Sequence, residues 1–429
     1  MTQSLTHSVR LPNGITLITT ENPATDIVAA RLFIRAGTRW ESPQKLGLSH
    51  LLAAVMTKGT HQWTAMEIAE KVESVGASLG TDASADYFVL SLKTVTADFE
   101  PMLALAQDIL CQPSLPPEQV ELERQLTLQS IRAQQERPFT VAYDHLRRQM
   151  YGGHPYGTSI LGTNATVSTL TSDDLKAYHQ CYFRPDNLVI SICGRISSAA
   201  AIALAEELFG DWRVPPSPLP SPPVVTLPAQ AQVKGIVQET QQSIIMLGYP
   251  AASVEQQLDY LTLKLLNTYL GNGLSSRLFV ELREKRGLAY DVSAFYPTRC
   301  DRSQFVAYIG TAPENTATAH ACLQAELQRL VTTPLSDAEL QMAKNKLLGQ
   351  YALGKQTNAE IAQLLGWYET LGLGIGFDTD FAPAIAQITA EQLQAVAIAY
   401  FNTTPYLTVV GPAPALETIE ALAASELAQ

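Results

Sequence analysis

The chain has 429 residues, 46% of them hydrophobic, and a formal net charge of −12 at pH 7. Chains longer than about 250–300 residues usually divide into domains, so this length predicts two of them. The acidic excess repels phosphate backbones and anionic lipids. Nucleic acid and membrane surfaces are therefore excluded as expected partners, and a basic peptide is favoured.

The cysteines and the N-terminal residues indicate in which cellular compartment the protein is expected. There are five cysteines, widely spaced and without a C-x-x-C pair, so neither a zinc ribbon nor a disulfide framework is predicted. Apolar neighbours, as at Cys193 and Cys322, favour buried free thiols. The first residues lack a signal-peptide pattern, and no apolar run approaches the roughly 20 residues that span a bilayer. We expect a cytoplasmic protein that does not enter a membrane.

Strand and helix patterns alternate along the first half of the chain. Alternating and continuous apolar runs predict strands at 15–18, 27–34, 87–92 and 188–193. Amphipathic runs predict helices at 48–58, 65–75, 100–110 and 118–135. Such a pattern is typical of an α+β domain in which helices face one sheet, although it does not specify the strand order.

The predicted helix at 48–58 lies in a stretch that has the frame of a metal site. In GLSHLLAAVMTKGT, residues 47–60, one histidine, His50, stands in an apolar run. Helical zinc sites place two histidines and a glutamate on one face at this spacing. Ala53 and Ala54 stand at the positions where those groups would be. Taken alone, His50 is interpreted as a packed or hydrogen-bonded helix residue.

A proline-rich segment divides the sequence near its midpoint. Residues 214–230 read VPPSPLPSPPVVTLPAQ, and clustered proline favours an extended linker because it cannot donate to a helix or a sheet. The predicted domains are therefore 1–213 and 231–429, joined by 214–230.

The two sides of this linker resemble each other. Residues 170–183 align with 388–401: each segment has a threonine followed three residues later by Asp or Gln, ends in Tyr-Phe and precedes a β-rich run. The Thr-x-x-Asp/Gln spacing is that of a capping box at a helix start. Residues 114–126 and 334–347 form a second similar pair. We predict a duplicated domain.

The second half repeats the alternation and contains a distinctive turn. Strands are predicted at 243–248, 305–309 and 406–410, and helices at 256–270 and 275–285. After the second helix, Gly287 suits the residue that follows a helix end, and a strand is expected from about Ala289. This turn would bring the side chains of Arg283 and Tyr290 together. On pattern alone, Arg283 complements the helix dipole, Tyr290 is core material, and the Gly271-Asn-Gly273 loop is a turn.

The stretch 47–60 resembles the signature helix of the M16 (pitrilysin-type) zinc peptidases, G-L-A-H-F-L-E-H-M-x-F-K-G-T. The resemblance places Ala53 at the general base and Ala54 at the second histidine ligand, and makes His50 a residual ligand position. The family's distal ligand segment, E-R-x-x-V-x-x-E-I, is similar to residues 123–131, with Ser130 at the ligand glutamate. Alanine has no donor atom and a serine hydroxyl is a poor zinc ligand. None of the other histidines lies at helical spacing from His50, so no metal is expected in this chain.

The segment LREKRGLAY, residues 282–290, is similar to the C-terminal motif of the same family. The resemblance implies that Arg283 and Tyr290 contact the substrate, and two such donors aimed at a scissile carbonyl would stabilise its oxyanion. It also implies that Gly271 and Gly273 present backbone to a peptide. The resemblance covers essentially the whole chain and implies two homologous α/β-sandwich domains of the mitochondrial processing peptidase type. Each would have a mainly antiparallel sheet faced by helices, and the two would close like a clamshell around a chamber.

In the heterodimeric branch of the family, one subunit carries H-x-x-E-H and the other carries the Arg/Tyr pair. The first hypothesis is therefore a non-catalytic, substrate-binding subunit of a zinc metallopeptidase that cleaves peptides in an enclosed chamber. An H-x-x-E-H partner would supply zinc, general base and water, and the chain alone could form a homodimer. The alternative is a proteolytically inactive scaffold or peptide-binding protein, like the related core subunits of the cytochrome complex. Independent peptidase activity would need a site that the sequence does not contain.

Overall fold

The computed structural model describes residues 6–228, 231 and 233–417. Within them the chain forms two compact units, each built on one β-sheet. The first unit takes in residues up to 131, 159–223 and 352–379, and the second takes in 132–158, 224–351 and 380 onwards. Neither unit is a continuous stretch of sequence. The two sheets with their covering helices confirm the α+β class.

The first sheet has six strands in the order β1-β2-β6-β3-β5-β4. All neighbours pair antiparallel except β2 and β6, which are parallel. Every residue of β6 is buried, as expected for a central strand that is covered on both faces. The strands are β1 (Thr6–Arg10), β2 (Thr16–Glu21), β3 (Ile27–Ile34), β4 (Ser78–Ala83), β5 (Phe88–Val95) and β6 (Leu188–Gly194).

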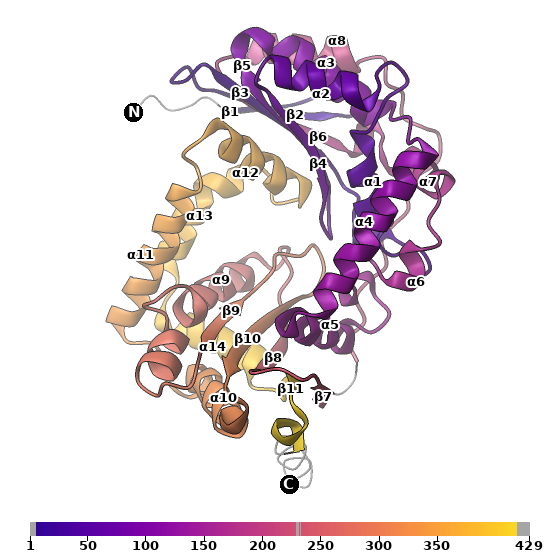
Figure 1. Ribbon diagram of the computed structural model, residues 1–429. Coiled ribbons are helices and arrows are strands. Elements are labelled where there is room, and N and C mark those ends of the chain that lie inside the picture. The colour runs from indigo at the N-terminus through magenta and orange to yellow at the C-terminus, as the bar shows by residue number, and fades with distance from the viewer. Residues whose placement is uncertain (1–5, 229–230, 232, 418–429) are drawn as a thin grey trace. The chain divides into compact units, whose positions relative to one another are not determined.

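Helices cover both faces of this sheet (Figure 1). On one face lie α1 (Leu48–Met56), α2 (Ala65–Ser74), α3 (Phe99–Cys111) and α8 (Ser198–Phe209). On the other face lies α12 (Asn358–Thr370). Strand alternation supplies both cores: Leu32 packs toward the first group, whereas Phe33 packs toward Leu365 of α12.

The second sheet has five strands in the order β7-β11-β8-β10-β9. The order repeats β2-β6-β3-β5-β4 of the first sheet strand for strand, including the parallel first pair. This repeat confirms two homologous α/β sandwiches. The strands are β7 (Val233–Val237), β8 (Ser243–Ala251), β9 (Asp291–Phe295), β10 (Ser303–Thr311) and β11 (Tyr406–Gly411).

Helices also cover the second sheet. They are α9 (Gln257–Gly271), α10 (Thr316–Thr332) and α14 (Ala390–Phe401), with α5 (Pro138–Tyr151) against β8 and β11. Gly248 of β8 allows α5 to come close, because a Cβ there would lie 2.8 Å from the Met150 sulfur. The remaining α-helices of the described residues are α4 (Pro117–Gln135), α6 (Asn164–Val167), α7 (Ser172–Tyr182), α11 (Asp337–Leu353) and α13 (Gly376–Gln387).

The two halves of the sequence exchange a helix. In chain order α5 precedes the proline-rich segment, yet it packs on the second sheet, and α12 follows that segment, yet it packs on the first. The predicted halves 1–213 and 231–429 therefore describe the duplication in sequence, whereas the compact units include the exchanged helices.

The proline-rich segment is neither helix nor strand over residues 214–228, and residues 229–230 lie outside the described part. Arg184 holds its beginning, because its guanidinium donates to the carbonyl oxygens of Pro215 and Ser217. The Val225 N–H donates to the Asp301 carboxylate at 2.9 Å. The contacts of Arg184 lie within the first unit, and the contact between Val225 and Asp301 lies within the second.

Two predicted element boundaries differ from the structure. The predicted helix at 275–285 ends in a π-helical segment, η5 (Phe279–Glu284), and the strand expected from about Ala289 begins at Asp291.

The predicted capping boxes at Thr171 and Thr389 are confirmed. Cys193 is buried as expected, whereas the expectation of burial is wrong for Cys322, which is partly exposed.

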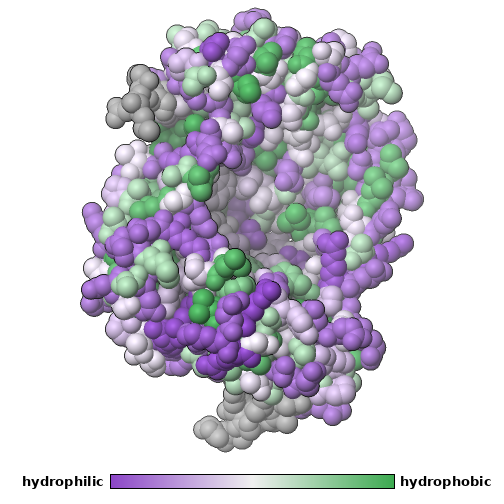
Figure 2. Space-filling view, turned by 60° about the vertical axis from the view of Figure 1, so that its left-hand side comes forward, coloured by the Kyte–Doolittle hydropathy of each residue, from purple (hydrophilic) through white to green (hydrophobic). Residues whose placement is uncertain are grey.

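In the part of the chain that the structure describes, every helix is too short or too polar to cross a membrane. On the face drawn in Figure 2, hydrophobic residues occur in small groups among hydrophilic ones.

Candidate functional site

Helix α1 begins at a glycine that no other residue could replace without strain. Gly47 is the N-cap residue with φ 93°, and a Cβ there would lie 2.5 Å from the Leu161 carbonyl oxygen. The Glu41 carboxylate accepts hydrogen bonds from the N–H groups of Gly47 and Ser49 at 2.8 and 2.6 Å. Burial raises the pKa of Glu41 to about 7, although these hydrogen bonds oppose the shift. Glu41 thus caps α1 from within the protein.

His50 lies in the first turn of α1 with its side chain largely shielded from solvent. Burial lowers its pKa, and the nearby carboxylates of Asp82 and Glu123 oppose that shift. The Glu123 carboxylate also pairs with Lys58 at 2.9 Å. His50 therefore lies among acidic groups, one of which already has a cation partner.

The positions that would complete a zinc site carry no suitable groups. Ala53 is buried, and its carbonyl oxygen accepts a hydrogen bond from Thr81 at 2.6 Å. Ser130 is exposed on α4, and its hydroxyl donates to the Leu126 carbonyl oxygen at 2.9 Å. Across the described residues no three His, Cys, Asp or Glu side chains are placed to hold a metal ion. The donor set does not fit a zinc ion.

Arg283 and Tyr290 lie on either side of a tight turn in the second unit. Arg283 is in the last turn of η5, and the chain then reverses at Gly287, which has φ 63°. The Leu288 N–H donates to the Leu282 carbonyl oxygen at 2.9 Å, and the Tyr290 N–H donates to that of Gly310, also at 2.9 Å. The turn is therefore fixed by hydrogen bonds on both sides.

The Arg283 guanidinium donates to the Tyr290 backbone carbonyl at 3.1 Å and lies 5.0 Å from the centre of the Phe279 ring. This hydrogen bond joins the Arg283 side chain to the Tyr290 backbone, whereas the sequence predicted that the two side chains would come together. The Tyr290 side chain is 58% exposed, so its phenol is not core material. Both side chains are exposed and carry hydrogen-bond donors.

Ion pairs hold η5 in place. The sequence motif did not predict these ion pairs. The Glu281 carboxylate pairs with Arg277 at 3.1 Å and with Lys285 at 2.8 Å. Arg277 also pairs with Glu326 of α10 at 2.7 Å. These contacts anchor the segment that carries Arg283.

The Gly271–Gly273 loop is held by its neighbours. A Cβ on Gly271 would lie 2.0 Å from the Ala294 nitrogen of β9, so only glycine fits there. The Ser293 hydroxyl donates to the Gly271 carbonyl oxygen at 2.6 Å. Lys346 of α11 donates to the Asn272 carbonyl oxygen, and Gln350 accepts from the Asn272 amide at 2.8 Å. Gly273 has φ 77°. These interactions fix the backbone next to η5.

Two family models match the chain. Residues 16–164 match the model described as insulinase (peptidase family M16), and residues 169–347 match that described as peptidase M16 inactive domain. An uncharacterized zinc protease of Streptomyces coelicolor is 26% identical over 412 residues, which are 94% of this chain and 88% of that protein. One of Bacillus subtilis is 28% identical over 368 residues, 84% of this chain and 88% of that protein.

Solved structures are also similar. A peptidase M16 inactive domain from Pseudomonas fluorescens superposes with a TM-score of 0.87 at 25% identity, covering 95% of this chain and 98% of that one. A protease from Helicobacter pylori gives 0.89 at 23% identity and covers 95% and 99%, which shows a shared fold.

Proposed function

Since the chain belongs to the M16 peptidase family, we propose that it is the non-catalytic, substrate-binding subunit of a two-chain zinc peptidase. A partner with an intact H-x-x-E-H helix would supply the zinc ion and the general base. In this chain, Arg283 and Tyr290 would bind the peptide backbone and polarise the scissile carbonyl, and the Gly271–Gly273 loop would lie along the peptide. The cytoplasmic location remains a prediction.

One contrast carries the proposal. The positions on α1 and α4 that would complete a metal site hold Ala53, Ala54 and Ser130, whereas the Arg283 and Tyr290 side chains are exposed on a turn that backbone hydrogen bonds hold on both sides. An exposed arginine and an exposed phenol can donate to a peptide carbonyl without first breaking a buried contact. A partner that brings a metal site would complement this chain.

A second candidate function is an inactive scaffold or peptide-binding protein. The absence of metal-binding groups at Ala53, Ala54 and Ser130 supports this second function equally well. It does not account for the phenol of Tyr290, which is mostly exposed. The absence of partner-dependent cleavage across a broad peptide library would favour the scaffold.

The assigned roles are tested by mixing the chain with an M16 chain that carries H-x-x-E-H and following a basic quenched-fluorescent peptide. Arg283→Ala and Tyr290→Phe should each lower kcat/KM by about 10²-fold or more, the usual effect of removing an oxyanion donor. Glu284→Ala, an exposed change in the same turn, should leave the rate near that of the parent.

Pair formation is measured in parallel by size-exclusion chromatography with light scattering. The variants should still form the pair, because Arg283 and Tyr290 are exposed and their loss disturbs no core. Unchanged cleavage by Arg283→Ala and Tyr290→Phe would show that the roles are wrongly assigned.

A further inference from the structure

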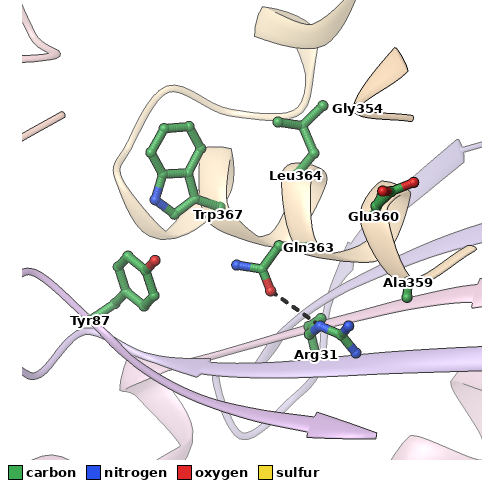
Figure 3. Close-up of a pocket in the computed structure, with 8 residues that line it drawn as sticks. All are labelled: Arg31, Tyr87, Gly354, Ala359, Glu360, Gln363, Leu364 and Trp367. Carbon is green, nitrogen blue, oxygen red and sulfur yellow. Dashed lines mark hydrogen bonds between the residues drawn. The ribbon is translucent and has the colours of Figure 1, made fainter. Parts of the chain in front are cut away.

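A cavity of about 360 Å³ lies in the first unit, on the face of the sheet that α12 covers (Figure 3). Its walls are the side chain of Tyr87, which precedes β5, and those of Leu364 and Trp367 on α12. Arg31 of β3 and Gln363 of α12 provide polar groups. The cavity therefore combines an apolar wall with hydrogen-bond donors, which is the usual composition of a small-ligand pocket.

The orientation of Gln363 is fixed by its neighbour. Arg31 Nε donates to Gln363 Oε1 at 3.1 Å. Arginine has no acceptor, so the amide oxygen must face it and the amide NH₂ must face the other way. Figure 3 shows the amide nitrogen on the side of Tyr87 and Trp367. Within the described part of the chain this NH₂ donates to no protein acceptor, and neither does Trp367 Nε1.

Arg31 brings a positive charge without a carboxylate partner among the described residues. Its NH1 donates to the backbone oxygens of Ala30 and Leu92 at 3.0 and 3.2 Å, and burial lowers its pKa. A cation in such surroundings is stabilised by an added anion.

Glu360 lines the same cavity but does not serve as that anion. Its Oε2 accepts hydrogen bonds from the N–H groups of Gln356 and Thr357 and from the Thr357 hydroxyl. Figure 3 shows its carboxylate directed away from Arg31. Of the two charged side chains that line the cavity, Arg31 is therefore the one left to attract an anion.

We propose that this cavity binds the C-terminal residue of a peptide. A large hydrophobic side chain would pack against Tyr87, Leu364 and Trp367, and the free terminal carboxylate would accept a hydrogen bond from the Gln363 NH₂ and be stabilised by the nearby positive charge of Arg31. The inference rests on the proposed function in that it takes the ligand to be a peptide. Hydrolysis of a peptide creates such a carboxylate, so the cavity would hold a substrate end or a product.

Binding to the full chain alone is measured by titration calorimetry with three probes. They are acetyl-Ala-Ala-Phe with a free carboxylate, the same peptide as its carboxamide, and acetyl-Ala-Ala-Ala with a free carboxylate. The phenylalanine acid should bind about tenfold tighter than either of the others, because a charge-assisted contact and the aromatic wall each contribute. Equal binding of acid and amide, or no binding of the acid, would overturn the inference.

Gln363→Glu tests the same contact from the protein side. The new carboxylate would pair with Arg31 and repel the ligand, so the preference for the acid over the amide should vanish. Gln341→Glu adds the same charge at an exposed position on α11 and should preserve the preference. Melting temperatures of both variants report whether the fold is retained. A preserved preference in Gln363→Glu, with the fold intact, would contradict the assignment.

This assay needs no partner chain, so its failure is separable from failure of the proposed function. Partner-dependent cleavage that persists while acid and amide bind alike would refute only the carboxylate pocket.

Discussion

Glu339 is a single carboxylate whose hydrogen bonds join three helices of the second unit. Its Oε1 accepts from the Tyr269 hydroxyl of α9 at 2.6 Å and from Arg329 of α10 at 3.2 Å. Its Oε2 accepts from the backbone and the hydroxyl of Ser336, where α11 starts. Because α11 also carries Lys346, which holds the Asn272 carbonyl, this residue supports the loop from a distance.

Glu339→Gln should reduce stability in a pH-dependent way. Burial alone would raise the pKa of Glu339, but the hydrogen bonds from Tyr269 and Ser336 and the charge of Arg329 outweigh it and lower the pKa to about 2. The stabilisation from the ionised form is therefore complete above the ordinary value of 4.5 and is lost as the pH falls toward 2.

We expect the substitution to cost about 2 kcal/mol at pH 7, allowing for solvent screening of a partly exposed group. The cost should shrink at pH 3. Urea unfolding of both proteins at pH 7, 5 and 3 measures it. A cost that is the same at all three values would contradict the role of the charge.

At the scale of elements, α12 lies close to the first sheet because of one glycine. A Cβ on Gly366 would lie 2.6 Å from Phe33 Cε2 and 2.9 Å from Ser191 Cβ. Neither neighbour can move easily, because both side chains are buried in the sheet. The position of α12, and with it the cavity beside Arg31, depends on this contact.

Gly366→Ala should therefore destabilise the first unit by about 1–3 kcal/mol, the usual cost of overpacking. The matched control is Gly376→Ala at the start of α13, where an added Cβ meets nothing within 4 Å. Its effect should stay within about 0.5 kcal/mol. Thermal unfolding of both variants measures the difference, and equal stabilities would show that the packing at Gly366 is looser than its distances indicate.

Local patterns predicted most elements but not all of them. Helices such as α3 and α4 follow from amphipathic periodicity, and the capped starts of α7 and α14 follow from Thr-x-x-Asp/Gln. Strand β4, SLGTDA, has small and polar residues and no hydrophobic alternation, so nothing in its pattern marked it. The frame of α1 and the Arg283–Tyr290 turn are continuous in sequence, which is why motif reading located them.

At the scale of the whole molecule, the duplication was visible in sequence but the helix exchange was not. Repeated motifs reveal that two domains share an ancestor, yet which sheet α5 or α12 packs on depends on contacts between residues far apart in the chain. The cavity beside Arg31 was missed for the same reason, because Arg31 and Gln363 are 332 positions apart. Its polar groups form no local motif.

The proposed function requires a partner, because this chain would complete a peptidase that it cannot form alone. The most direct measurement titrates it into a fixed amount of an H-x-x-E-H M16 chain, with zinc present, and records the cleavage rate of a peptide library. We expect little cleavage by either chain alone and a rate that rises to a plateau at a one-to-one ratio. A rate that does not change as this chain is added, or zinc-dependent cleavage by this chain on its own, would contradict it.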